Sequence, residues 1–157
     1  LRAGGSATYT IEYKVDPFKI GAVTVEKAFD AVGYLNYQLT ATSLPPLKGS
    51  VFAEYTHGNH NLRWTVHYID SYVDQRASIF APNAVNGAIQ TKGAKIDDTW
   101  LHEIDYRWLA PWDVTVNLSI DNVFDSEPSF ARLDLNYDPF TGNALGRTYK
   151  IAVKKKF

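Results

Sequence analysis

Apolar and polar side chains alternate without a break along residues 113–122. The even positions from 114 to 120 are all apolar: Val114, Val116, Leu118 and Ile120. A period of two is typical of a β-strand with one apolar face. The same alternation, with interruptions, predicts strands over about 8–15, 23–39, 51–57, 62–73, 99–109 and 148–157. The pattern therefore predicts an all-β protein of about seven antiparallel strands, without helices.

The first short turn is predicted where Gly58 precedes Asn59, an order that suits a two-residue type II′ hairpin turn. This turn would place Glu54 opposite Arg63, so that acid meets base across the hairpin. The agreement between turn chemistry and cross-strand pairs predicts the register of these two strands.

The second short turn is predicted over residues 110–112, because Pro111 fits a turn and could not sit inside a central strand. It would bring Trp108 opposite Val114 and Asp105 opposite Asn117. By contrast, the connections at about 76–97 and 124–146 are long and rich in Pro, Gly and Asn. Short turns at one end and long loops at the other are typical of an outer-membrane β-barrel.

Composition narrows the function classes without deciding among them. The 157 residues suit one domain, and the formal net charge of -1 disfavours nucleic acid as a partner. There is no Cys, which excludes disulfides and thiolate catalysis, and no stretch of about 18 apolar residues that would form a spanning helix. No catalytic motif, cofactor motif or metal-ligand spacing stands out, so we expect no enzyme, no cofactor and no metal site. A soluble β-sandwich binding module and a smaller porin-like or enzymatic barrel remain alternatives.

Aromatic residues and strand number bear on the barrel interpretation. Trp108 and Trp112 lie near a short turn and Tyr68 and Trp100 toward the other end, as expected for two interfacial girdles. Single-chain bacterial barrels close with an even number of strands, so seven strands predict a piece of a larger barrel. The start of the chain, which has neither Met nor a signal peptide, leads to the same expectation of a longer protein.

Three stretches near the C-terminus resemble the end of TonB-dependent outer-membrane receptors. They are residues 116–128 (VNLSIDNVFDSEP), 136–139 (NYDP) and 145–149 (LGRTY), followed by a strand that runs to Phe157. Residues 62–72 are similar to an earlier strand of that family. The resemblance implies that residues 1–157 are the C-terminal segment of a plugged, 22-stranded transmembrane barrel, whose plug and earlier strands lie elsewhere.

The family also implies a function and partners. Such receptors lie in the outer membrane of Gram-negative bacteria and take up a scarce nutrient, such as a ferric siderophore, cobalamin or a glycan. Energy comes from the TonB complex through the plug. The expected partners are therefore outer-membrane lipid, the plug and remaining strands, the TonB complex, the outer-membrane assembly machinery and a small-molecule or glycan ligand.

Strand parity and loop position assign candidate residues to four roles. Lumen-lining positions, interpreted as a polar wall that docks a plug rather than as ligand contacts, are Glu12, Glu54, Arg63, His67, Glu103, Asp105 and Arg107. Lipid-facing positions are Val114, Val116, Leu118, Ile120, Tyr149, Ile151 and Val153. The assembly signal of the last strand comprises Tyr149, Ile151, Val153 and Phe157, with Lys155 breaking the alternation. Candidates for ligand contact in the long loops, by location alone, are Arg76, Asn83, Asn86, Gln90, Lys92, Arg132 and Asp134.

Overall fold

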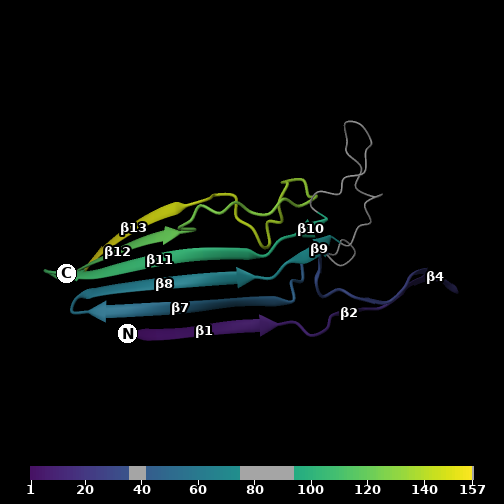
Figure 1. The fold of residues 1–157 in the computed structure, drawn as a ribbon, viewed down its shortest axis with the longest axis horizontal. Coiled ribbons are helices and arrows are strands. Elements are labelled where there is room, and N and C mark those ends of the chain that lie inside the picture. The colour runs from purple at the N-terminus through teal and green to yellow at the C-terminus, as the bar shows by residue number, and fades with distance from the viewer. Residues whose placement is uncertain (36–41, 75–93, 157) are drawn as a thin grey trace.

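The computed structural model describes residues 1–35, 42–74 and 94–156, and within them it contains strands and no helix. Six strands form one antiparallel sheet in the order β1 (Arg2–Tyr9), β7 (Leu47–His57), β8 (His60–Ile69), β11 (Thr99–Ala110), β12 (Val114–Asp121) and β13 (Thr148–Lys155). Figure 1 shows these strands side by side. The prediction of an all-β protein is confirmed. Among the described residues β1 and β13 each pair on one side only, so the six strands form an open sheet.

Pairing aligns the two-residue period from strand to strand. One row across five strands contains only apolar residues: Ala53, Trp64, Ile104, Ile120 and Tyr149. The neighbouring row on the other face is polar across all six strands: Arg2, Glu54, Arg63, Asp105, Ser119 and Lys150. Because partners in a ladder point to the same face, the sheet has one mainly apolar face and one mainly polar face, the latter also carrying Phe52, Leu101 and Leu109.

The β7–β8 hairpin has the predicted register, with Glu54 opposite Arg63, and the positive φ of 54° falls on Gly58. The predicted β11–β12 register is wrong by two residues. Trp108 pairs with Val116, and Asp105 pairs with Ser119.

The reason for the β11–β12 shift lies in the turn, which occupies residues 111–113. Trp112 and Asp113 both have left-handed φ, 62° and 56°, and Asp113 therefore belongs to the turn rather than to the strand. A shift of two residues keeps every side chain on its predicted face.

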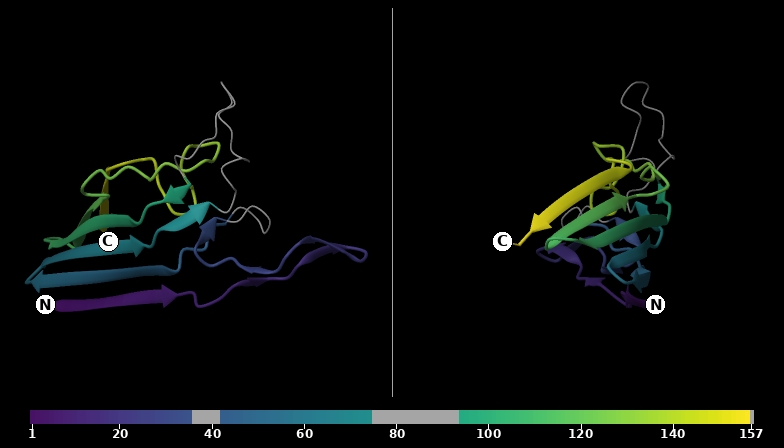
Figure 2. Two further views of the ribbon diagram at one scale, coloured as in Figure 1. Left: turned by 45° about the vertical axis from the view of Figure 1, so that its right-hand side comes forward. Right: turned by 90° about the vertical axis from the view of Figure 1, so that its left-hand side faces the viewer.

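The N-terminal strands differ most from the predictions at 8–15 and 23–39. The sheet strand is β1, which ends at Tyr9. Beyond it, short strands β2 (Lys14–Val15), β3 (Phe18–Ile20), β4 (Val23–Glu26) and β5 (Phe29–Asp30) pair as β2–β5 and β3–β4. They form a narrow hairpin that extends past the end of the sheet (Figures 1 and 2). The apolar alternation of residues 14–30 is therefore used in a local hairpin, while residues 36–39 of the second predicted strand lie outside the described residues. The main sheet of the described residues has six strands rather than seven.

Connection lengths are sorted by end, as predicted. The turns at 58–59 and 111–113 lie at one end of the sheet, and the described parts of the connections 10–46, 70–98 and 122–147 lie at the other (Figure 1). At that second end β6 (Tyr34–Leu35), β9 (Tyr72–Asp74) and β10 (Lys95–Ile96) form a small sheet. Its β6–β9 pair is parallel, so the prediction that all strands are antiparallel is wrong.

A small core joins the three long connections. Leu35 comes from the first, Tyr72 and Ile96 from the second and Ala131 from the third; all four are buried and in contact. We call this core, together with β6, β9, β10 and residues 126–142, the loop-end cap. The described part of the chain contains no helix with the length and apolar character needed to cross a membrane.

Candidate functional site: two faces and a loop-end cap

The apolar face of the sheet is uncovered. Large side chains on it remain exposed from one side of the sheet to the other, including Val51 at 59%, Trp64 at 48% and Ile151 at 73%. Isolated exposed apolar residues are ordinary, but a large contiguous apolar surface is typical of contact with a partner or a membrane. All seven positions predicted to face lipid belong to β12 and β13 and lie on this face.

Two histidines on the apolar face each contact an aromatic side chain of a neighbouring strand through a ring nitrogen. The Trp64 indole Nε1 donates to Nδ1 of His102 at 3.2 Å, and the two rings stack with centroids 5.6 Å apart. In this contact Nδ1 of His102 is the acceptor. Nearer the short turns, Nδ1 of His60 lies 2.6 Å from the Tyr106 hydroxyl. Tyr and Trp side chains combine an apolar ring with one polar group, and such side chains suit the interface between an apolar and an aqueous environment.

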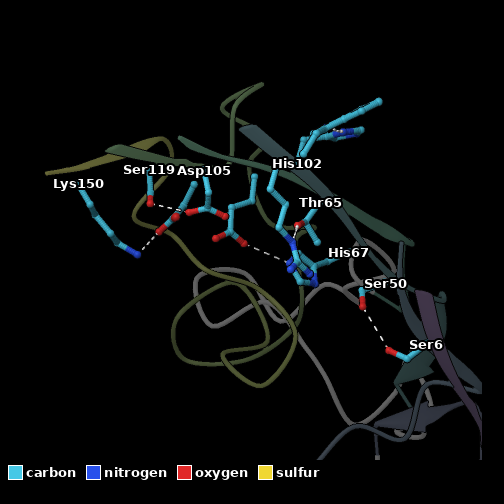
Figure 3. A network of polar contacts seen from close by, with 12 residues as sticks. Ser6, Ser50, Thr65, His67, His102, Asp105, Ser119 and Lys150 are labelled. Atoms are coloured by element: carbon cyan, nitrogen blue, oxygen red, sulfur yellow. Dashed lines mark hydrogen bonds and ion pairs between the residues drawn. The ribbon is translucent and has the colours of Figure 1, made fainter. Parts of the chain in front are cut away.

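The polar face carries a row of alternating charge. Arg63 lies 4.0 Å from Glu54 and also stacks 3.9 Å over the Phe52 ring. Further along, the Ser119 hydroxyl donates to Asp105 at 2.6 Å. Figure 3 shows Ser119, Asp105 and Lys150 on the same side of the sheet. Most charged side chains in this row of the polar face therefore contact an oppositely charged or polar neighbour.

Glu54, Arg63, His67, Glu103, Asp105 and Arg107, six of the predicted lumen positions, lie on this polar face. Glu12 does not. It lies outside the sheet, exposed and 2.9 Å from Lys14, because β1 ends at Tyr9. The prediction for Glu12 is therefore corrected to a position in the hairpin extension.

A small cavity of about 110 Å³ opens where the polar face meets the third long connection. It is lined by residues that include His67, Glu103, Asp121 and Asn143. Nε2 of His67 lies 3.3 Å from a Glu103 oxygen, and Asp121 forms an ion pair with Lys150. The cavity can exchange hydrogen bonds with a small polar group. No group of three or more potential metal ligands occurs among the described residues.

The loop-end cap is held by buried polar contacts. The Tyr72 hydroxyl donates to Oδ2 of Asp138 at 2.6 Å and lies 2.6 Å from the Thr141 hydroxyl. Burial raises the pKa of Tyr72, and the neighbouring Asp138 carboxylate adds to the rise. The other Asp138 oxygen accepts the Phe140 amide at 2.9 Å. These bonds fix the 136–142 turn on β9.

Arg132 forms a buried ion pair with Asp74, its Nε 2.9 Å from Oδ2, and the side chains are 4% and 0% exposed. This predicted ligand-contact residue thus joins the third connection to the second. Asp134 is exposed. The remaining ligand candidates, Arg76, Asn83, Asn86, Gln90 and Lys92, lie outside the described residues, as does Phe157 of the predicted assembly signal.

Residues 121–126 close the base of the third connection. Oδ1 of Asp125 accepts the Arg147 amide at 2.7 Å, beside Gly146 with φ of 66°. A Cβ at Gly146 would lie 2.7 Å from that oxygen, so the position requires glycine. Asn122 closes a second loop by two hydrogen bonds to the Ser126 backbone. The sequence signal for these contacts is the Asp and Gly that flank a long loop between two strands.

The hairpin extension is anchored by one carboxylate. Oδ1 of Asp30 accepts the amides of Tyr13 at 3.0 Å and Val32 at 3.1 Å. The hydrogen bond from the Tyr13 amide, and to a lesser extent that from the Val32 amide, lowers the pKa of Asp30.

Comparison with known proteins adds no family, because no family model, curated protein or solved structure matches the chain.

Proposed function

We propose that this chain is part of the β-barrel of a TonB-dependent outer-membrane receptor. The observation that carries the proposal is the uncovered apolar face, which continues across six strands while the opposite face is polar. Transmembrane barrel strands alternate in this way because one side meets hydrocarbon and the other a polar lumen. A β-sandwich needs a second sheet against the apolar face, and the described part of the chain supplies none.

Strand dimensions and end chemistry support the same proposal. The strands are 8 to 12 residues long, close to the roughly 9–11 residues of a tilted membrane strand. The Tyr68 and Trp100 rings meet at 4.5 Å near the long connections, and Trp108 stacks on His60 near the short turns. This arrangement suits two aromatic girdles, with the short turns in the periplasm and the loop-end cap outside the cell.

The two outer strands of the sheet, β1 and β13, each have an edge that no described strand pairs with. In lipid, unpaired backbone groups cost several kcal/mol each, so a spanning sheet must close. The six strands therefore require further strands of the same receptor, which with the plug would complete the proposed 22-stranded barrel. The unpaired edge of β13, which bears Tyr149, Ile151 and Val153, suits templating by the assembly machinery.

The receptor would import a scarce nutrient, a ferric siderophore, cobalamin or a glycan, with energy from the TonB complex. Its gene should be deleted in the native bacterium, and uptake of labelled members of the three nutrient classes measured with and without a proton-motive-force uncoupler. We expect loss of uptake of one class, and the same loss in the uncoupled parent. Unchanged uptake of all three classes in the deletion strain contradicts the transport proposal.

A further inference from the structure

A groove of about 460 Å³ lies on the apolar face, near the end of the sheet where the long connections begin. The ladder that crosses it consists of Ala7, Gly49, Tyr68 and Trp100, two small residues followed by two large aromatic ones. This step in side-chain size forms the floor and one wall of the groove. The complete lining is Ser6, Ala7, Leu47, Gly49, Ser50, Val51, Val66, Tyr68 and Trp100.

The lining is almost entirely apolar and, apart from two serines, belongs to the apolar face. Ser6 and Ser50 project from the polar face, where their hydroxyl oxygens lie 3.3 Å apart (Figure 3), so they present main-chain atoms to the groove. The volume lies within the roughly 300–1,000 Å³ of small-molecule sites. An occupant of this groove must therefore be apolar over most of its surface.

Two carboxylates lie at the end of the groove that is nearest the long connections. Asp70 directly follows β8 and Asp98 directly precedes β11, beyond the last ladder pair of these two strands. Oδ1 of Asp70 accepts the Tyr68 hydroxyl at 3.1 Å, and Oδ2 of Asp98 accepts the indole Nε1 of Trp100 at 2.7 Å. Each carboxylate is thus one hydrogen bond away from the aromatic wall.

These two carboxylates lack a cationic neighbour within the described ranges of the chain. Neither Asp70 nor Asp98 forms an ion pair there, and the nearby Lys95 pairs with Asp97 instead, at 3.7 Å. Like charges at the same end of two paired strands are unfavourable. An occupant with a cationic end would relieve this repulsion.

We propose that the groove binds one membrane lipid whose headgroup carries a primary ammonium group. The acyl chain lies on the floor formed by Ala7 and Gly49, beside Tyr68, and the ammonium group donates to Asp70 and Asp98. The inference rests on the proposed function, which places the apolar face in hydrocarbon. Charge selects the headgroup, because two carboxylates attract an ammonium group and repel a headgroup that is only anionic.

The test reconstitutes the complete protein in phosphatidylcholine vesicles with a trace of phosphatidylethanolamine that has a photoreactive group on its acyl chain. EDTA in the buffer prevents a divalent cation from joining a carboxylate to a lipid phosphate. Adducts are mapped by mass spectrometry, and labelling of the groove is divided by labelling of β12 and β13, which lie outside it. We expect this ratio to exceed one, to fall with excess unlabelled phosphatidylethanolamine and to resist anionic phosphatidylglycerol.

Two pairs of variants separate shape from charge. Ala7→Leu fills the floor and should lower the ratio, whereas Ala3→Leu, on the same face of β1 but outside the groove, should leave it unchanged. Asp70→Asn with Asp98→Asn should lower the ratio about five-fold, the factor that corresponds to about 1 kcal/mol. Asparagine retains an accepting oxygen but no charge. Asp97→Asn, the neighbouring exposed carboxylate, should leave the ratio unchanged.

The outcomes distinguish this inference from the proposed function. Lipid adducts along β12 and β13 with a ratio near one, or with equal competition by phosphatidylglycerol and phosphatidylethanolamine, overturn the lipid site and leave the barrel intact. A ratio that is unchanged by Ala7→Leu, or by the two asparagine substitutions, also overturns the site. The competition uses the parent protein, so it decides the matter if a variant fails to assemble. Absence of lipid adducts from β12 and β13 overturns the barrel itself.

Discussion

Ile151→Arg is the substitution whose effect depends most on what surrounds the apolar face. Ile151 lies within β13, three residues after Thr148 and four before Lys155, and is 73% exposed. At about 3.3 Å per residue and a tilt of about 40°, it would lie roughly 8 Å and 10 Å along the membrane normal from the two strand ends. An apolar band about 25 Å tall therefore places it near the bilayer midplane.

The expected cost follows from that depth. Arg at the midplane of a barrel's lipid face destabilises it by about 2–4 kcal/mol, or roughly thirty- to seven-hundred-fold in the folding equilibrium. If water surrounded this face, a substitution at such an exposed position would change stability by about 0.5 kcal/mol or less. The two environments thus predict effects that differ several-fold in free energy.

The assay is urea unfolding of the complete protein in lipid vesicles, with Ala152→Arg as the matched control. Ala152 is the next residue along β13, is also exposed and faces the polar side opposite Asn117. We expect Ile151→Arg to lower the free energy of unfolding by about 2–4 kcal/mol and Ala152→Arg to have a mild effect. Equal effects of the two substitutions would refute the assignment of the faces.

Three further predictions concern the long connections. Gly146→Ala should destabilise more than Gly21→Ala in denaturant titrations, because both positions have positive φ but only Gly146 would meet an oxygen, at 2.7 Å; the left-handed backbone costs about 1–2 kcal/mol in either case. Arg132→Met should cost about 3–5 kcal/mol in the cap, measured by hydrogen exchange, because it removes the buried ion pair between Arg132 and Asp74. The pKa of Tyr72 is higher in the folded than in the unfolded protein, so its contribution to the stability of the cap should be complete below the unfolded pKa of 10.0 and should decline as pH rises above it. Tyr72→Phe should remove this decline in the free energy of unfolding of the cap.

Each of these three predictions has a result that would contradict it. Equal losses of stability at the two glycines would mean that the close oxygen is irrelevant. Faster exchange throughout β7, β8 and β11 in Arg132→Met would mean that the cap is not a separate unit. A phenylalanine variant with the parent's alkaline decline would assign that decline to another group.

The sequence predicted the sheet best where local chemistry and cross-strand pairing agree. Gly58 and the Glu54–Arg63 pair determine one hairpin, and its register is confirmed. The predicted register of β11 and β12 was wrong by two residues, because the left-handed φ of Trp112, a bulky residue, leaves no signal in the hydrophobic pattern. It failed completely for β1, where a run of Ala, Gly and Ser offers no alternation to detect.

The loop-end cap lay beyond any reasoning from local pattern. Leu35, Tyr72, Ile96 and Ala131 come from three connections far apart in the chain, and only the folded sheet brings their ends together. The same holds for Arg132, which by location suited ligand contact and in the structure is buried against Asp74. Strand parity, by contrast, assigned six of the seven lumen candidates to the polar face, because a period of two needs only local sequence.

The proposed contact between hydrocarbon and the apolar face is tested most directly by spin labels placed singly at residues 149–154 of the complete protein in bilayers. Collision rates with oxygen, which concentrates in hydrocarbon, and with a water-soluble nickel chelate should alternate out of phase, with oxygen favoured at Tyr149, Ile151 and Val153. Rates without a period of two, or with nickel favoured at those three positions, would contradict the account.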